Sequence, residues 1–405
     1  MILARQCTEA QRRLIQIFAD QCREGEQTKK LPPEAAACGQ FLGDPGRTHR
    51  GLHGSAAAIR VLGDGGADAR DLSCRILTYL TNRSDIERRV LVNSADTLNK
   101  IAVDERNVIK LSETLFALRF IPLSECDAHP LVTDLAKRLD EARVGRGWNY
   151  FTDTPGEEAD PVPTAFAVRA LAAHQLDVGI PASFLLEVVQ GGIQADLFVQ
   201  ALCLFALTFL PNQDGIDPKM LGRALTKLWR RLSSLLSQDL EANIEFVDFT
   251  REDYHYHYVR IPWQLYLLAV AARLSPLRRY SSTLAQRRME GIIAAVNGPT
   301  GFHYPHSGRR MSSRTSAILY DVLGLIASEL ATHRLMALSN PFLAADRLRS
   351  AIATRVVVAV AALYIVIASV DAWVHRQPHR LSDLGPALMA GFLIAVLTWL
   401  KPRES

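Results

Sequence analysis

Three carboxylates that precede a strongly apolar segment are the residues of this sequence best positioned for acid–base chemistry. Glu157, Glu158 and Asp160 belong to an acidic loop that leads into the apolar segment 164–171. A carboxyl group acts as a general acid at neutral pH when apolar surroundings raise its pKa. We therefore take these three as the candidate catalytic residues. The alternative is a solvated acidic loop without a chemical role.

Arginines dominate the segment 273–314 and predict contact with phosphate groups or with lipid. Eight arginines stand there against one acidic residue, Glu290. A guanidinium group binds phosphate oxygens through two parallel hydrogen bonds, which fits a diphosphate or a nucleotide. The same charge also fits a surface of anionic lipids, and both interpretations stay open. The candidate ligand contacts in this segment are His303, Arg309, Arg310 and Arg314.

A metal-like spacing occurs in the segment EDYHYHY, from Glu252 to Tyr258. Asp253, His255 and His257 alternate along it, but two histidines at this spacing need further ligands from elsewhere in the chain. We expect the segment to lie at the entrance of a helix with its polar groups in water. We therefore predict no metal site and retain these residues as candidate ligand contacts. Nothing in the sequence identifies a cofactor, since it has no GxxxxGK loop, no HExxH pair and no nucleophile elbow.

Six similar apolar segments recur along the first 323 residues. They begin at positions 55, 114, 164, 200, 264 and 316 and read SAAAIRVL, TLFALRFI, TAFAVRAL, QALCLFAL, QLYLLAVA and SAILYDVL. Their small and apolar residues face all directions, which is typical of helices that are covered on every side. One-sided amphipathic segments alternate with them, as at Leu131, Leu135 and Leu139. The pattern predicts an all-α fold with six inner and six outer helices in a closed double ring, with an open solenoid as the alternative.

A glycine and aromatic residues stand before two of these segments. Gly147-Trp148-Asn149-Tyr150 precedes TAFAVRAL, Gly301-Phe302-His303-Tyr304 precedes SAILYDVL, and Gly51 to Gly54 before SAAAIRVL is a degenerate copy. In these features residues 1–335 resemble the terpenoid cyclase and protein prenyltransferase superfamily. The resemblance implies an (α/α)6 toroid whose central cavity is lined by aromatic side chains. It makes Trp148, Tyr150, His303 and Tyr304 candidate ligand contacts, with packing between helices as the alternative role.

The catalytic motifs of that superfamily are missing from this sequence. Class II cyclases protonate a polyprenyl chain with a DxDD element, and the sequence has none. Protein prenyltransferases hold zinc with a set that includes a DxC element, which is also absent. The resemblance therefore predicts the fold more directly than the activity.

Two apolar runs near the C-terminus predict a membrane hairpin. Val356 to Val370 contains fifteen uncharged residues and Leu384 to Leu400 contains seventeen, each slightly shorter than the roughly 20 residues that span a bilayer. Basic residues flank both outer ends of the pair, which predicts that both termini are cytoplasmic. We therefore expect a cytoplasmic toroid at 1–345 and a two-helix transmembrane hairpin at 346–405, in an inner or plasma membrane. A buried or interfacial helical hairpin is the alternative.

Composition excludes several other classes of protein. With 46 Lys and Arg against 42 Asp and Glu and 48% hydrophobic residues, the chain is neither disordered nor basic enough to predict nucleic-acid binding. The six cysteines form no CxxC pair, and the sequence opens without a secretory signal, so we expect all six to be reduced.

Three functions fit these features. The first is a catalytically silent toroid that binds a small molecule or a protein partner as a membrane sensor or effector. The second is an enzyme that takes an isoprenoid or another lipid substrate, with or without a diphosphate, from the bilayer. The third is a sugar-processing α/α barrel, which a cytoplasmic head and the lack of a carboxylate pair disfavour. Membrane lipid is an expected partner of the first two.

Overall fold

The computed structural model describes the part of the chain that forms most of the predicted repeats. It covers residues 2–29, 31–39, 41–42, 51–90, 104–121, 126–153, 158–191, 193–210, 223–224, 246–251, 254–259, 263–274 and 311–339. Two compact units are distinguished, Met1–Thr332 and His333–Ser405. The predicted hairpin at 346–405 lies outside the described residues. Within those residues, no helix is long and apolar enough to cross a membrane.

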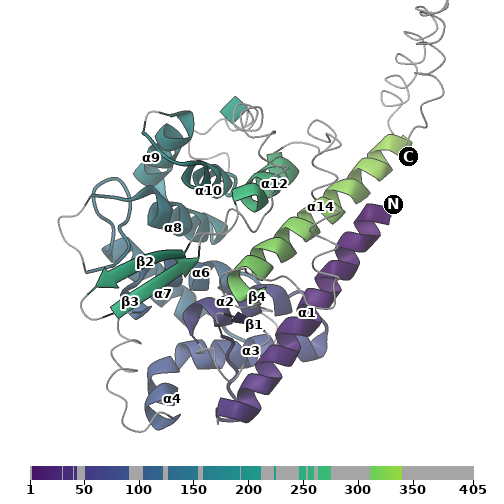
Figure 1. Cartoon of the computed structure of the whole chain (residues 1–405), viewed down its shortest axis with the longest axis vertical. Helices are drawn as coiled ribbons and strands as arrows, with labels where there is room; N and C mark the ends of the chain where they lie inside the picture. Colours follow the sequence, from purple (N-terminus) through teal and green to yellow (C-terminus); the bar gives the residue numbers. More distant parts are fainter. Residues whose placement is uncertain are drawn as a thin grey trace, which may run out of the picture. The chain divides into compact units, whose positions relative to one another are not determined.

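Helices make up most of the described structure (Figure 1), as the sequence predicts. They are α1 (Ile2–Lys29), α2 (Leu52–Leu62), α3 (Ala67–Thr81), α4 (Arg83–Val90), α6 (Val108–Leu118), α7 (His129–Glu141), α8 (Pro161–Ala173), α9 (Gly179–Gln190), α10 (Leu197–Leu207), α12 (Trp263–Leu274) and α14 (Ser313–Ser339). Each of the six repeated apolar segments lies on one of them, on α2, α6, α8, α10, α12 and α14 in chain order. The segment on α6 runs three residues past the end of its helix.

Burial separates two kinds of helix along the chain. In α8 every residue from Val162 to Ala172 is buried, and α2 and α10 are buried almost as completely. In contrast, α7 buries only Leu135 and Leu139, one turn apart on a single face. The all-round apolar pattern and the one-sided pattern thus correspond to covered and half-covered helices, because each apolar residue is removed from water where its helix meets a neighbour.

The covered helices are neighbours in chain order. α2 packs against α6, α6 against α8, α8 against α10 and α10 against α12. Of the half-covered helices, α3 packs against α2, α7 packs against α6, and α9 packs against both α8 and α10. The long helix α1 contacts α2 and α3, and the side-chain amide of Gln11 on α1 donates to the carbonyl oxygen of Tyr320 on α14. Figure 1 shows α1 running alongside the first turns of α14.

The Gly147–Trp148 element is fixed to the start of α8. The Trp148 amide donates to Thr164 Oγ1 at 2.9 Å, and this hydroxyl donates back to the Trp148 carbonyl oxygen. A Cβ atom on Gly147 would lie 2.3 Å from Thr164 Oγ1, so only glycine permits this approach. Asp160 caps α8, since its carboxylate accepts a hydrogen bond from the Val162 amide.

The corresponding contact on α2 comes from another part of the chain than expected. Ser55 occupies the repeat position of Thr164, and its Oγ accepts a hydrogen bond from the amide of Cys38. The segment Gly51 to Gly54 is itself the start of α2, with Gly51 as the N-cap residue. The interpretation of Gly51–Gly54 as a copy of the Gly147 turn is therefore wrong. The residue that bonds to Ser55 in place of such a turn is Cys38, about a dozen positions before the helix begins.

Two short antiparallel ribbons interrupt the helices. β1 (Phe41–Leu42) pairs with β4 (Met311–Ser312), and β2 (Phe246–Arg251) pairs with β3 (Tyr254–Val259). Residues 254–258 of the EDYHYHY segment lie in β3, which was not predicted as a strand and which ends at Val259, shortly before α12 begins at Trp263. Aromatic residues alternate along this strand, and that pattern favours extended structure.

The cysteines are not all reduced. Cys74 on α3 and Cys126, just before α7, form a disulfide. Cys22 and Cys38 are both buried and not disulfide-bonded, and the Cys22 thiol donates to the Cys38 sulfur at 3.3 Å. The expectation of six free thiols is wrong for Cys74 and Cys126, whose 52-residue separation hid a pair that the fold brings together.

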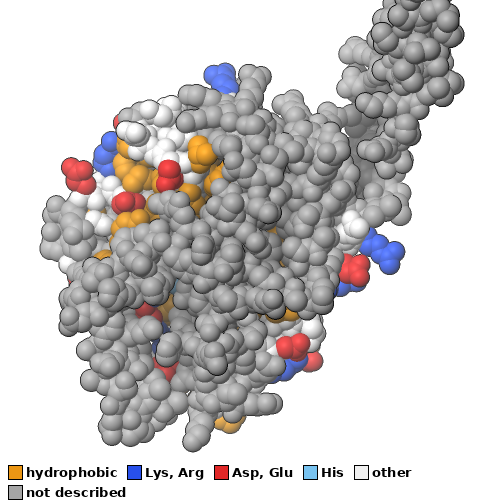
Figure 2. Space-filling view, viewed as in Figure 1, with side chains coloured by type: hydrophobic (Ala, Val, Ile, Leu, Met, Phe, Trp, Pro, Cys, Tyr) orange, Lys and Arg blue, Asp and Glu red, His pale blue; other side chains and the backbone are white. Residues whose placement is uncertain are grey.

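The described surface carries both signs of charge with scattered apolar side chains. Figure 2 shows apolar side chains exposed on the face where α8 and α9 lie. Leu176 and Ile180 are the exposed large apolar residues of the described part. Isolated exposed apolar residues of this kind are normal on a protein surface.

Candidate functional site

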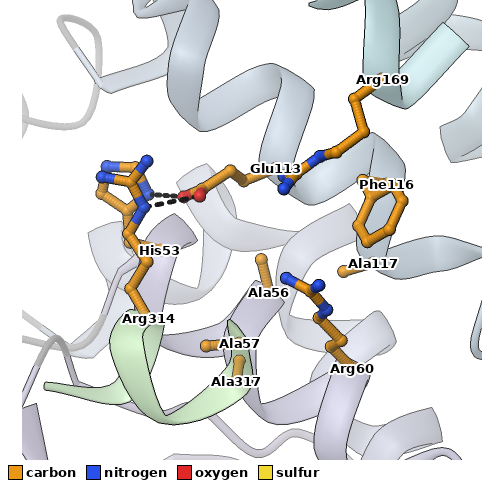
Figure 3. Close-up of a pocket in the computed structure, with 10 residues that line it drawn as sticks. All are labelled: His53, Ala56, Ala57, Arg60, Glu113, Phe116, Ala117, Arg169, Arg314 and Ala317. Carbon is orange, nitrogen blue, oxygen red and sulfur yellow. Dashed lines mark hydrogen bonds and ion pairs between the residues drawn. The ribbon is translucent and has the colours of Figure 1, made fainter. Parts of the chain in front are cut away.

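A small cavity lies among the covered helices α2, α6, α8 and α14. Its volume is about 10 Å³, close to the smallest space that holds one water molecule. Figure 3 shows its lining, which combines alanines with charged side chains and one phenylalanine. The lining residues are His53, Ala56, Ala57, Arg60, Glu113, Phe116, Ala117, Arg169, Arg314 and Ala317.

Glu113 of α6 is the central carboxylate of this site. Its Oε1 accepts a hydrogen bond from Nε of Arg314 on α14 at 2.6 Å, and its Oε2 lies 2.6 Å from Nδ1 of His53 on α2. Figure 3 shows both partners reaching Glu113 from the same side. One buried carboxylate thus joins three helices that are distant in the sequence.

Arg60 and Arg169 occupy the other side of the cavity. Their guanidinium groups lie over the ring of Phe116, at 4.8 Å and 4.3 Å from its centroid. Arg169 also lies over Phe166, and Arg60 forms an ion pair with Asp321 of α14. Contact with an aromatic face partly replaces the water that a buried cation loses.

Positive charge exceeds negative charge in this group. Among the described residues it contains three guanidinium groups, from Arg60, Arg169 and Arg314, and two carboxylates, from Glu113 and Asp321. Burial lowers the pKa of His53 below its ordinary value, although Glu113 opposes this, so the imidazole is neutral at pH 7. The imidazole therefore adds no charge to the described members of this group.

The electrostatics of Glu113 decide what chemistry the site supports. Burial raises the pKa of its carboxyl group, but Arg314 and His53 outweigh that effect and hold the pKa well below its ordinary value. A carboxylate held ionised in this way does not donate a proton at neutral pH. Among the described residues that line the cavity, Glu113 is therefore not suited to protonate a polyprenyl chain.

The acidic candidates lie away from this cavity. Glu158 is exposed, Asp160 caps α8, and Glu157 lies outside the described residues. None of the described ones lines the cavity. The Asp160 carboxylate accepts a hydrogen bond from the Val162 amide at the start of α8, which gives it a structural role.

The aromatic candidates Trp148 and Tyr150 also lie elsewhere. Trp148 is fully buried, its ring nitrogen donates to the carbonyl oxygen of Leu139, and Arg143 lies over its ring. Tyr150 is half-buried, and its carbonyl oxygen accepts a hydrogen bond from the Val108 amide. Both positions correspond to the packing alternative.

Of the basic and histidine candidates that the structure describes, only Arg314 lines the cavity. Asp253, His303, Tyr304, Arg309 and Arg310 lie outside the described residues, while His255 and His257 lie in β3 opposite Thr250 and Asp248. Among the described residues, no three His, Cys, Asp or Glu side chains come close enough to hold a metal ion.

Sequence reasoning missed His53, Arg60, Glu113 and Arg169. A signal for two of them existed in the repeats. The sixth residue of SAAAIRVL is Arg60, that of TAFAVRAL is Arg169 and that of SAILYDVL is Asp321. The sixth residue of TLFALRFI is charged as well, but this residue, Arg119, is exposed and lies just past the end of α6. A charge at this position inside a helix that is apolar on every side indicates that the position faces an interior space, where charges need partners.

The comparisons with known proteins leave the function to be argued from this site. No protein-family model matches the sequence, and no curated protein matches it.

Proposed function

We propose that this protein is a non-catalytic binding module anchored to a membrane, acting as a sensor or effector that recognises a partner or ligand with its outer surface. The observation that carries the proposal is the small volume of the cavity among α2, α6, α8 and α14, as far as the described residues line it. A space of about 10 Å³ admits no isoprenoid chain or sugar, since pockets for such ligands measure hundreds of cubic ångströms. The charged side chains that occupy the centre are engaged with one another.

The proposed architecture of the head is a closed (α/α)6 toroid. Its support is the chain of contacts from α2 through α6, α8 and α10 to α12, together with the ion pairs that join α14 to α2 and α6. In an open solenoid the last covered helix would lie far from the first. The pairing of Asp321 on α14 with Arg60 on α2 favours closure.

The membrane anchor of the proposal is the apolar pair of runs between Val356 and Leu400. Their basic flanks favour a head and termini on the cytoplasmic side of an inner or plasma membrane. The disulfide between Cys74 and Cys126 opposes this orientation, because cytosolic reductants keep most thiols reduced. Alkylation of thiols in intact cells tests the assignment: a reduced Cys74 supports a cytoplasmic head, and a persistent disulfide assigns the head to the opposite side.

We propose anionic membrane lipid as a second binding partner, and the basic segment 273–314 as the part of the chain that contacts it. Arg314 does not serve this role, because it is buried against Glu113. Arg273 is exposed, and its guanidinium donates to the Thr208 carbonyl oxygen while it lies over Phe209. Joint binding of a phosphorylated ligand by Arg309, Arg310 and Arg314 is disfavoured, because Arg314 already has a carboxylate partner in Glu113.

The alternative function is an enzyme that acts on an isoprenoid or other lipid, with or without a diphosphate. The apolar C-terminal runs favour it, because they would bring the head to such substrates. It requires the centre to open and Glu113 to leave both of its partners. The geometry of the cavity therefore supports the binding module better.

Turnover measurements on the full-length protein in detergent distinguish the two functions. Farnesyl and geranylgeranyl diphosphate are added with and without Mg²⁺, and diphosphate release and lipid products are followed. We expect neither from the wild-type protein, and we expect crosslinking in membranes to give a discrete adduct with a partner. Turnover by the wild-type protein that disappears in Glu113→Gln would contradict the binding-module function and support the enzyme.

A further inference from the structure

Two buried cysteines, Cys22 on α1 and Cys38 in the segment that follows α1, form a close pair. Their side chains are 0% and 1% exposed, and neither is disulfide-bonded. The Cys22 thiol donates a hydrogen bond to the Cys38 sulfur, with 3.3 Å between the two sulfur atoms. A disulfide bond is about 2.05 Å long, so an approach of roughly one ångström joins the two atoms.

The backbone around Cys38 is anchored to two helices. The Cys38 amide donates to Ser55 Oγ on α2, and the Cys38 carbonyl oxygen accepts a hydrogen bond from the amide of Gly51, the N-cap residue of α2. Two residues earlier, the Ala36 amide donates to the carbonyl oxygen of Arg75 on α3. These bonds keep the Cys38 sulfur within reach of α1, and two groups held in this way react as if at high concentration.

The positions of the other cysteines make this pairing specific. Cys7 lies on the same helix as Cys22 but 15 positions earlier, which places it about 22 Å away along the helix axis. Cys203 on α10 donates its thiol hydrogen to the carbonyl oxygen of Pro161. The remaining two cysteines already form a disulfide with each other.

We propose that Cys22 and Cys38 are a redox-sensitive pair that forms a second disulfide when the protein meets a hydroperoxide. Hydrogen peroxide is small enough to reach a buried pair during local opening, whereas thiol–disulfide exchange requires a bulkier sulfur compound to gain access. The new bond ties α1 to the segment that docks on the start of α2. The pair lies outside the lining of the cavity, so it stands or falls separately from the proposed function.

The reaction balances with hydrogen peroxide as the oxidant. One sulfur attacks as a thiolate, an S–O bond forms as the O–O bond breaks, and the released hydroxide takes up the proton of that thiol and leaves as water. The other sulfur then attacks the sulfenic sulfur. The S–S bond forms as the S–O bond breaks, and the second water leaves with the proton of the second thiol. Two electrons pass from the thiols to the peroxide.

Peptide mapping of the full-length protein in detergent tests the pair directly. The protein is purified without reductant, incubated with or without hydrogen peroxide, alkylated in denaturant and digested with trypsin, which places the two cysteines on the separate peptides 14–23 and 31–47. We expect these peptides to be linked after peroxide and both alkylated without it. Peptides 71–75 and 120–137, linked by the Cys74–Cys126 disulfide, are the reference in both samples.

Two results of this mapping would overturn the proposal. One is that both thiols are still alkylated after peroxide, and the other is that they are oxidised separately to sulfinic acids without a linked product. Equal linkage by oxidised glutathione would contradict the assignment of a hydroperoxide as the oxidant, because it would show that a bulky disulfide reaches the pair.

Thermal unfolding with matched variants assigns the effect to the pair. The bond closes a loop with a sequence separation of 16, which constrains the unfolded chain, so we expect peroxide to raise the Tm of the wild type by several degrees. Cys38→Ala should lose this rise, whereas Cys203→Ala, which removes an equally buried thiol, should keep it. A rise that persists in Cys38→Ala would overturn the proposal. If Cys38→Ala does not fold, the linked peptides of the wild type decide.

Discussion

Arg314, the second residue of α14, and Glu113, on α6, are joined by a hydrogen bond of 2.6 Å between Nε and Oε1 across 201 residues of sequence. Both side chains are 8% exposed. His53 contacts the other carboxylate oxygen, so one acid holds groups from three helices. Removing one member of such a group leaves buried charge without compensation, so substitutions in this cluster should strongly reduce stability.

Glu113→Gln is expected to destabilise the head by about 3–5 kcal/mol, because it leaves Arg314 without its buried counter-charge. The matched control is Arg106→Gln, which removes an ion pair with Asp153 whose side chains are each 35% exposed. An exposed pair contributes about 0–1 kcal/mol. Denaturant unfolding of both variants measures the difference, and equal losses would contradict the central role of Glu113. The double variant Glu113→Gln with Arg314→Gln should lose less than the sum of the single losses.

Acidification is expected to lower the stability of the head, with His53 as one cause. Burial lowers the pKa of His53, so the unfolded chain takes up a proton near pH 6.5 before the folded protein does. Stability falls wherever the unfolded state binds more protons, which here means that it falls as the pH drops below about 6.5. Glu113 adds a second loss below about pH 4.3, because its pKa is lowered in the folded state.

The control for this pH dependence is His53→Gln, measured by denaturant midpoints between pH 7.5 and 5.5. The groups that act on His53 are Glu113, Lys110 and Arg314, and the variant leaves all three in place. Burial lowers the pKa of His174 as well, so the variant should retain part of the slope. An identical slope in variant and wild type would show that His53 does not contribute.

Ala165→Asp is expected to cost roughly 4 kcal/mol or more, since it introduces a charge at a fully buried position in the middle of the all-round buried helix α8. Thr133→Asp, on the exposed face of α7, is the matched control and should change stability by less than about 0.5 kcal/mol. Thermal unfolding of both proteins provides the measurement. Similar Tm values would mean that the covered helices are not the core of the head.

Loss of the Cys74–Cys126 disulfide is expected to reduce stability by about 2–4 kcal/mol, because the bond closes a loop with a sequence separation of 52. The test compares the wild type with Cys74→Ser plus Cys126→Ser, each with and without reductant. Reductant should lower the Tm of the wild type to that of the double variant and leave the double variant unchanged. A wild type insensitive to reductant would indicate that the two thiols are free.

The sequence by itself determined the helices of this protein. The six apolar segments could be predicted to be helices because their apolar residues are spread around the whole helix. This pattern depends only on the local sequence and not on which helix packs against the segment. The contrast between α7 and α8 is local for the same reason: Leu135 and Leu139 mark one buried face, whereas Val162 to Ala172 has no exposed one. The strand at 254–259 is also indicated by its local sequence, because tyrosines alternate along it.

Only the tertiary structure decided which side chains meet. Arg60, Glu113, Arg169 and Arg314 belong to four helices, and their contacts depend on which helices are neighbours and on how each is rotated about its axis. The same holds for Cys74 and Cys126, and for Asp160, whose carboxylate is drawn to the amide at the start of its own helix rather than to a cavity. Charge and residue type are visible in the sequence, but burial is not. Burial is what makes the carboxylate of Glu113 and the groups that contact it depend on one another for stability.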